Sequence, residues 1–230
     1  MFKTHVKAMV KGLAALKLIA LALLVGLAWY ASVPIELTAA DKKTFQEMGF
    51  ESLSFEQQVQ LVRKVQTEVF KRAPMGAGIP DFKPREPADL MRYGQGLCYD
   101  RSRTFDKAFA YLGFESRHVY LLYRENLGFF SAFFRKGQPS HAVTEVKTLR
   151  GWLFVDSNSE WIAVTRSGEP VGADDVWRRI DEFDNPPSYL RDPWWAIRGL
   201  YSRKGQFYGA GIMFPELNWS DFLSWILFEF

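Results

Sequence analysis

The sequence contains one cysteine in 230 residues, Cys98, within the stretch YGQGLCYDRSRTF. Apolar residues after it recur at helical spacing as far as Leu112, which predicts that Cys98 begins a helix that ends at Gly113. The free N–H groups and the dipole of a helix N-terminus favour a thiolate over a thiol, and they could also hold an oxyanion. A lone cysteine is otherwise a small buried hydrophobe, so a purely structural role is the alternative.

A thiol nucleophile needs a base within hydrogen-bond reach and a group that orients this base. The chain beyond its first thirty residues has two histidines. His118 lies in the middle of the predicted strand RHVYLL, where packing is the usual role. His141 opens the predicted strand HAVTEV directly after a loop, which is a common place for a functional residue. We therefore expect His141 to be the base.

Asp156 is the candidate for the third group, because it ends the stretch GWLFVD fifteen residues after His141. If residues 141–148 and 152–157 pair as an antiparallel hairpin, the start of the first strand faces the end of the second. Such a hairpin places the two side chains next to each other, with the register fixed only roughly. Asp156 could instead cap a turn with the two polar residues after it.

Gly-x-Cys at a helix start, His at the start of HAVTEV and Asp at the end of GWLFVD together resemble the transglutaminase-like superfamily of papain-like thiol enzymes, over residues 90–165. The resemblance implies an α+β fold in which the cysteine helix packs on an antiparallel sheet. It also implies that Cys98 is the nucleophile, His141 the general base and acid, and Asp156 the orienting carboxylate. Tyr99 stands where the family often has Trp, so the residues that shape the acyl site differ.

Three residues around the cysteine are further candidates for oxyanion or substrate contacts: Gln95, Gly96 and Tyr99. The glycines before Cys98 would let a substrate backbone approach closely, whereas Gln95 could simply be solvated. Arg101 and Arg103, on the predicted helix, are expected to form a solvated face. One cysteine excludes an intrachain disulfide and a cysteine-based zinc site, and three scattered histidines predict no metal. We expect no cofactor.

The net charge of +3 changes when the chain is divided, because residues 1–31 hold four lysines and no acidic residue. The remainder then carries +3 minus +4, or −1, which gives no electrostatic basis for nucleic-acid binding. Leu18–Ala31 is wholly apolar, and with a snorkelling Lys17 the span from Leu13 to Ala31 is long enough to cross a bilayer.

This N-terminal pattern predicts a signal anchor in a bacterial inner (cytoplasmic) membrane, crossing once. The basic flank would stay in the cytoplasm, and the body would be exported to the periplasm. A cleaved signal peptide is the competing interpretation, because Gly26-Leu27-Ala28 offers small residues at the spacing of a weak cleavage site.

The chain divides into three predicted segments: the anchor at 1–31, a helical part with a Pro-rich connector at 32–89, and the transglutaminase-like core with an aromatic C-terminal extension at 90–230. A capping box at Ser54-Phe55-Glu56-Gln57 predicts a helix over 55–72.

Four short stretches rich in β-branched and aromatic residues predict strands: FESRHVYLLYRE, HAVTEVKT, WLFVDS and WIAV. ADDVWRRI predicts a short helix, and residues 186–211 are expected to be irregular. The closing WSDFLSWILFEF predicts a helix that docks on the domain and is too short to span a membrane.

These patterns favour thiol-dependent acyl transfer at an amide bond of a protein or peptide. Transfer to water would make the protein a peptidase or amidase, and transfer to a second amine would be transamidation. The alternative is a catalytically silent, membrane-anchored module of the same fold that binds a peptide or glycan.

Overall fold

The computed structural model describes residues 17–23, 38–48, 54–80, 83, 85–124, 126–135, 137–201 and 216–228. The larger elements are α2 (Ala39–Gln46), α3 (Phe55–Arg72), α4 (Pro87–Tyr93), α5 (Cys98–Tyr111), β1 (Ser116–Tyr123), α6 (Phe129–Phe134), β2 (Ser140–Thr148), β3 (Gly151–Val155), β4 (Trp194–Arg198) and α7 (Trp219–Phe228). Short 3₁₀ turns lie at Ile180–Glu182 and Ser188–Arg191, and a small two-stranded sheet joins β5 (Leu200–Tyr201) to β6 (Glu216–Leu217).

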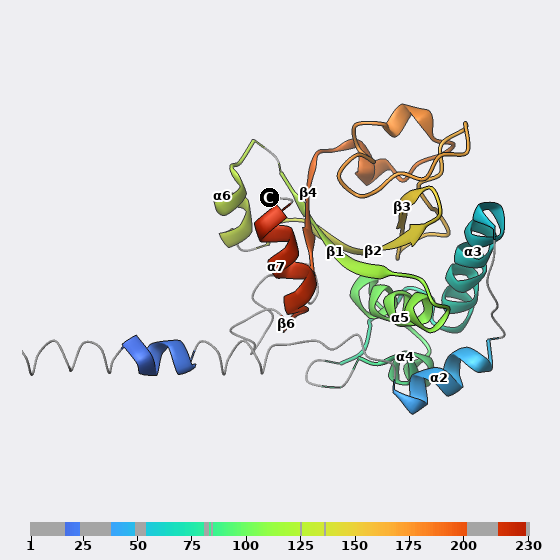
Figure 1. The fold of residues 1–230 in the computed structure, drawn as a ribbon, viewed down its shortest axis with the longest axis horizontal. Coiled ribbons are helices and arrows are strands. Elements are labelled where there is room, and N and C mark those ends of the chain that lie inside the picture. Colours follow the sequence, from blue (N-terminus) through green and yellow to red (C-terminus); the bar gives the residue numbers. More distant parts are fainter. Residues whose placement is uncertain are drawn as a thin grey trace, which may run out of the picture.

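The main sheet has the order β3-β2-β1-β4, and each neighbouring pair is antiparallel. Helix α5 packs on β1 and β2, with α3 and α4 against it (Figure 1). Side chains of the sheet alternate between two faces, as the strand geometry requires. Leu153 and Val155 join the apolar cluster beneath α5, whereas Phe154 between them joins a second cluster on the other face. The α+β fold with a cysteine-bearing helix on an antiparallel sheet is therefore as predicted.

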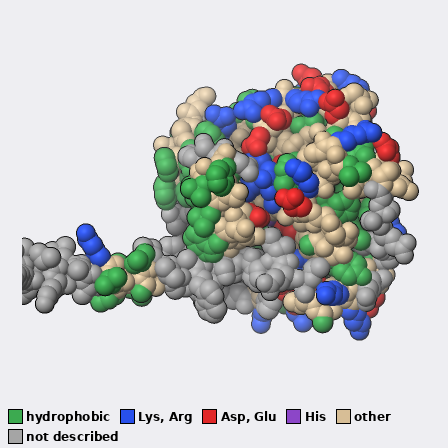
Figure 2. All heavy atoms as spheres, in the orientation of Figure 1, with side chains coloured by type: hydrophobic (Ala, Val, Ile, Leu, Met, Phe, Trp, Pro, Cys, Tyr) green, Lys and Arg blue, Asp and Glu red, His purple; other side chains and the backbone are tan. Residues whose placement is uncertain are grey.

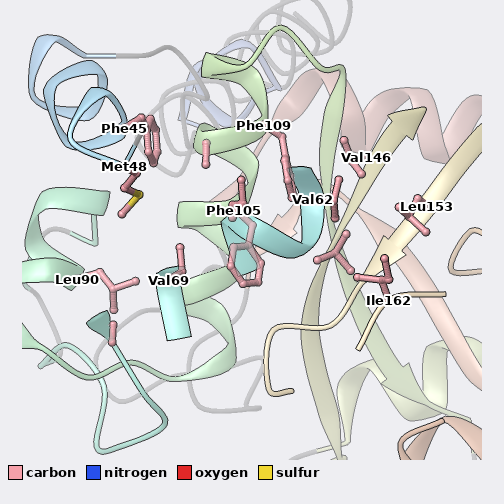
Figure 3. Close-up of a cluster of buried hydrophobic side chains, with 14 of the residues drawn as sticks. Phe45, Met48, Val62, Val69, Leu90, Phe105, Phe109, Val146, Leu153 and Ile162 are labelled. Atoms are coloured by element: carbon pink, nitrogen blue, oxygen red, sulfur yellow. The ribbon is translucent and has the colours of Figure 1, made fainter. Parts of the chain in front are cut away.

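Helix α3 begins and ends where its capping box predicts. The Ser54 side chain accepts the Gln57 N–H at 3.4 Å, and the Gln57 side chain accepts the Ser54 N–H at 2.9 Å. Its apolar stripe packs in the cluster beneath α5 (Figure 3). Members of this cluster come from α2, α3, α4, α5 and the sheet, and include Phe45, Val62, Val69, Leu90, Phe105, Phe109, Val146 and Leu153. The helices before Cys98 thus share one core with the helix that carries it.

Charged residues of α5 are buried together with its apolar ones. Lys107 is 2% exposed and reaches Asp41 of α2 at 2.9 Å and also pairs with Glu86. Arg103 is 7% exposed and pairs with Glu86 as well. The prediction of a solvated face at Arg101 and Arg103 is therefore wrong, because Glu86 compensates the buried charge of Arg103, and backbone and amide oxygens accept the hydrogen bonds of the buried Arg101.

Two predicted elements differ from the structure at the fourth strand. WIAV forms only isolated bridges, from Ile162 to β3 and from Val164 to Pro170. The fourth strand of the main sheet is β4, in the segment predicted to be irregular, and it pairs with the free side of β1. Pairing with β1, which is distant in sequence, stabilises this strand. The short aromatic sequence of β4 does not by itself predict that pairing.

The predicted short helix ADDVWRRI is also wrong, because these residues form successive turns with one 3₁₀ turn at Ile180–Glu182. Its first residues are held to the sheet instead. The Ala173 N–H donates to the buried Glu145 at 2.6 Å, and Asp174 pairs with Arg198 of β4 at 2.5 Å.

Helix α7 docks on the domain as expected, with Trp225 buried among aromatic side chains of α6 and β4. The outer side of the two helices stays apolar and exposed, at Phe130, Phe134, Leu227 and Phe228. Hydrophobic side chains accordingly gather over α6 and α7 on the face drawn in Figure 2.

The predicted anchor lies for the most part outside the described residues. Within it the structure describes 17–23 as an exposed helical stretch. Among the described residues, none of the helices combines the length and the apolar character needed to cross a membrane.

Candidate active site

Cys98 is the first residue of α5, at the end of a loop that is fixed by a buried carboxylate. Asp100 in the first turn accepts the Leu97 N–H at 3.0 Å and the Ile79 N–H at 3.2 Å, and it forms an ion pair with Arg85. An acidic group in the first turn also suits the positive end of the helix dipole. The loop is thus rigid, and it leaves the Cys98 side chain partly exposed.

His141 and Asp156 meet at one end of the β2–β3 hairpin. The pairing of Thr144 with Val155 continues to place Asp156 opposite Val143. The histidine and the aspartate are therefore diagonal neighbours, two positions apart in register, which is within reach of these side chains. Their contact is a hydrogen bond of 2.7 Å between His141 Nε2 and Asp156 Oδ1.

Asp156 is buried and accepts four hydrogen bonds. Besides His141, Oδ1 accepts the Asn158 N–H at 3.1 Å and the Tyr189 hydroxyl at 2.8 Å, while Oδ2 accepts the Ser159 hydroxyl at 2.6 Å. Burial alone would raise the pKa of this carboxyl group, but the hydrogen bond and charge of His141 and the other donors lower it. Asp156 is therefore an anion that fixes the imidazole ring.

The Cys98 thiol forms a hydrogen bond with His141. Because Nε2 bonds to Asp156, Nδ1 is the second polar atom of the ring, and it also lies 3.4 Å from the Asn158 side-chain nitrogen. Burial would lower the pKa of His141, but the hydrogen bonds to Asp156 and Cys98 raise it to about 9. Burial would likewise raise the pKa of Cys98, but His141 and the backbone N–H groups of Ala142 and Tyr99 lower it. Both shifts favour the thiolate–imidazolium form of the pair over the neutral thiol and imidazole.

Two residues that support this arrangement have no local signal in the sequence. Tyr189 lies in the segment predicted to be irregular, and besides its bond to Asp156 its ring packs edge-on against His141 at 5.0 Å between centroids. Gln66 of α3 is fully buried, and its side-chain amide donates to the carbonyls of Asp156, Ser159 and Trp161 at 2.7, 2.8 and 3.0 Å. These contacts hold the loop that presents the aspartate.

This part of the chain also matches a family. The model of the transglutaminase-like superfamily aligns with residues 52–157, a range that contains the cysteine, the histidine and the aspartate described above. Residues 52–157 are thus similar to the transglutaminase-like superfamily. The match starts near the beginning of α3, well before the motifs at 90–165 that carry the resemblance in the sequence.

A search of curated proteins finds no match to the chain. Among solved structures, the crystal structure of a proposed cysteine protease from Cytophaga hutchinsonii is similar, with 13% sequence identity and a TM-score of 0.32. The similarity covers 80% of this chain and 65% of that one, so the chain spans less than two thirds of the length of that protein.

The other residues singled out near the cysteine have structural roles in the transglutaminase-like core. Gly94 ends α4 in the left-handed conformation, with a φ of 64°. The Gly96 N–H donates to the Pro74 carbonyl at 3.0 Å, so it is not free to bind an oxyanion. A Cβ at Gly96 would lie 2.6 Å from Leu90 Cδ1. Gly96 therefore allows close packing against Leu90. The sequence had instead predicted that this glycine lets a substrate backbone approach.

Tyr99 points into the core and Gln95 toward the surface. The Tyr99 ring is 2% exposed and packs edge-on against Tyr201 at 5.7 Å, so only its backbone N–H reaches the sulfur. Gln95 is exposed, and its side chain lies where a Cβ on Gly76 would clash with it.

His118 is a packed residue of the core, in keeping with its position in the middle of β1. It is fully buried, stacks on Tyr201 at 3.8 Å between centroids, and its Nδ1 lies 2.8 Å from the Ser102 hydroxyl. Across the described residues, no cluster of three or more His, Cys, Asp or Glu side chains has an arrangement that could hold a metal ion.

Proposed function

We propose that the protein catalyses thiol-dependent acyl transfer at an amide bond of a peptide or protein, with Cys98 as the nucleophile and hydrolysis as the outcome. The observation that carries this proposal is the continuous hydrogen-bonded series from Cys98 through His141 to Asp156. An activated thiolate, a base and an orienting acid are the parts that covalent catalysis by cysteine needs.

In the proposed reaction the Cys98 thiolate attacks the carbonyl carbon, and a C–S bond forms as the carbonyl π electrons move to oxygen. The N–H of Cys98 is the first in α5 and has no carbonyl partner within the helix, so it can donate to this oxyanion. Gln95, which is exposed three residues earlier, would supply a second donor.

Collapse of the tetrahedral intermediate breaks the C–N bond while the His141 imidazolium gives its proton to the leaving amine. The neutral imidazole then removes a proton from water, which attacks the thioester carbon and releases a carboxylic acid and the thiolate. Asp156 stays ionised throughout and stabilises the imidazolium whenever it forms. An amine in the place of water would give transamidation.

The test is to trap the site with an epoxysuccinyl amide and to locate the adduct by mass spectrometry of peptides. We expect one adduct on Cys98, formed at least tenfold more slowly in His141→Ala. A folded protein that forms no adduct at Cys98, or that reacts equally fast without His141, would refute the proposal and favour a catalytically silent binding module. Release of products from a peptide library, with and without added primary amines, separates hydrolysis from transamidation.

We also propose that residues 1–31 hold the protein in the inner membrane, with the body at 90–230 in the periplasm. The basic flank and the apolar run at Leu13–Ala31 support this assignment. Intact mass of the protein from membranes washed with alkaline carbonate is the test. An uncleaved chain in the membrane pellet is expected, whereas a soluble chain lacking its first residues would show a cleaved signal peptide.

A further inference from the structure

The hydrogen bonds of Arg101 connect the two loops that present the nucleophile and the acid. Its Nη1 donates to the Gly96 carbonyl at 2.6 Å, on the loop before Cys98. Its Nε donates to the Ser157 carbonyl at 2.6 Å, and its Nη2 to the Asn158 side-chain oxygen at 2.8 Å. Both of these residues directly follow Asp156. One guanidinium group therefore links segments that lie about 60 residues apart in the sequence.

We propose that Arg101 is a positioning residue that sets the distance between the nucleophile loop and the acid loop, and that its positive charge balances the negative charges of the site. The inference deepens the proposed function, on which it rests for the roles of Cys98 and Asp156.

Burial makes this arrangement rigid. Arg101 is 0% exposed, and its guanidinium faces the Phe70 ring of α3 at 5.2 Å. The guanidinium group is planar and presents its donors as a fixed fork, so three bonds in three directions determine its orientation fully. A lysine at this position would keep the charge but could not span the same acceptors.

The partners of Arg101 differ from those of the other buried cations around α5. Arg85, Arg103 and Lys107 each form an ion pair with a carboxylate, from Asp100, Glu86 or Asp41. Among the described residues, by contrast, the hydrogen bonds of Arg101 all go to uncharged oxygens.

A buried cation needs negative charge close by, even when no ion pair forms. The negative charges that act on Arg101 are those of Cys98, Asp156 and Asp100. Asp100 is already paired with Arg85. The triad in its charged form carries one net negative charge, from the thiolate, the imidazolium and the carboxylate. The guanidinium of Arg101 adds one positive charge, so the net charge of the four groups is zero.

The experiment separates the charge of Arg101 from its geometry. Arg101→Met removes both, Arg101→Lys keeps the charge, and Arg103→Met is the matched control, because Arg103 is also buried on α5 but pairs with Glu86. Two readouts are used: the pH dependence of Cys98 alkylation by iodoacetamide, and release of p-nitrophenol from p-nitrophenyl acetate. Circular dichroism and thermal unfolding establish which variants are folded.

We expect Arg101→Met to raise the midpoint of alkylation by about one pH unit, which is a roughly tenfold lower rate near neutral pH. Arg101→Lys should keep the midpoint within about half a unit of wild type and lower p-nitrophenol release about tenfold, because the acid loop is no longer fixed. Arg103→Met should lower the melting temperature and leave the midpoint unchanged.

A folded Arg101→Met with the wild-type alkylation midpoint and ester turnover would overturn the inference, and so would an equal shift in Arg103→Met. If Arg101→Met does not fold, Arg101→Lys decides, since wild-type ester turnover in that variant contradicts the positioning role. The alkylation midpoint needs no substrate. Failure of the wild-type protein to release p-nitrophenol would therefore refute the proposed function, and the effect of Arg101 on the thiol would still be measured.

Discussion

Replacing His141 with alanine removes the cation that keeps the Cys98 sulfur ionised. The pKa of His141 is raised from 6.5 to about 9 although the ring is buried. This difference corresponds to about 3 kcal/mol of preference for the charged ring. The hydrogen bond to Asp156 supplies part of it, so we assign about half, or roughly 1–2 kcal/mol, to the interaction with the thiolate.

Without the imidazolium, burial raises the pKa of Cys98, and only the backbone N–H groups of Tyr99 and Ala142 lower it. A loss of about 1–2 kcal/mol by itself lowers the thiolate population about 5- to 30-fold. Because burial raises the pKa of Cys98, we expect the thiol to titrate near its ordinary value of 9.0, where about 1% is ionised at pH 7.

The assay is the rate of alkylation by iodoacetamide between pH 5 and pH 10, followed by intact mass. The wild-type midpoint should lie about one pH unit below that of His141→Ala, which should follow a single titration near pH 9 and react about tenfold more slowly at pH 7. His118→Asn, which changes the packed histidine, is the control and should keep the wild-type midpoint if it folds. A midpoint below pH 8 in folded His141→Ala would refute the reasoning.

Three further outcomes are expected. Asp156→Asn removes the carboxylate that helps to raise the pKa of His141 to about 9. In the pH–rate profile for p-nitrophenyl acetate, the alkaline limb should therefore move to lower pH, and the maximal rate should fall about 100-fold or more. An alkaline limb at the wild-type pH would contradict the assignment of Asp156. In Cys98→Ser, Asp156 still keeps the pKa of His141 above its unfolded value of 6.5. The charged histidine therefore stabilises the fold fully below pH 6.5, and this contribution is lost as the pH rises through the folded pKa. Urea unfolding should give a lower free energy of unfolding at pH 9 than at pH 6, and equal free energies would count against a charged His141. Gly96→Ala places a methyl group 2.6 Å from Leu90 Cδ1 and should cost about 1–3 kcal/mol of unfolding free energy. Gly128→Ala, whose added methyl group meets no neighbour and whose φ is −67°, is the control, and equal losses in both variants would argue against a clash.

Local patterns were sufficient to predict the parts of the site that depend on neighbours in sequence. Helix α3 follows from its capping box and apolar spacing, and Cys98 at a helix start follows from the period after it. The contact of His141 with Asp156 follows from one tight hairpin, and its register error of two positions still left the side chains within reach.

Features that depend on distant segments could not be predicted in this way. The burial of Arg101 requires acceptors on the loop after β3, and that of Arg103 requires Glu86, so the charged side of α5 looks like a solvated face in the sequence. Tyr189 reaches Asp156 from the 3₁₀ turn at Ser188–Arg191, in a segment predicted to be irregular. In each case the hydrogen-bond or ion-pair partner comes from a segment that is distant in sequence. The spacing and type of the neighbouring residues therefore do not predict it.

The buried cations of α5 also bear on where the chain can be divided. Lys107 and Arg103 take their counter-ions from Asp41 and Glu86, which both precede the predicted boundary at residue 89. A fragment that starts there would keep two cations in the core and lose both carboxylates, and breaking a buried pair costs about 3–5 kcal/mol. A typical domain has only about 5–15 kcal/mol of stability to lose. Residues before Cys98 thus supply the counter-ions of α5, and we expect the smallest fragment that folds to include α2.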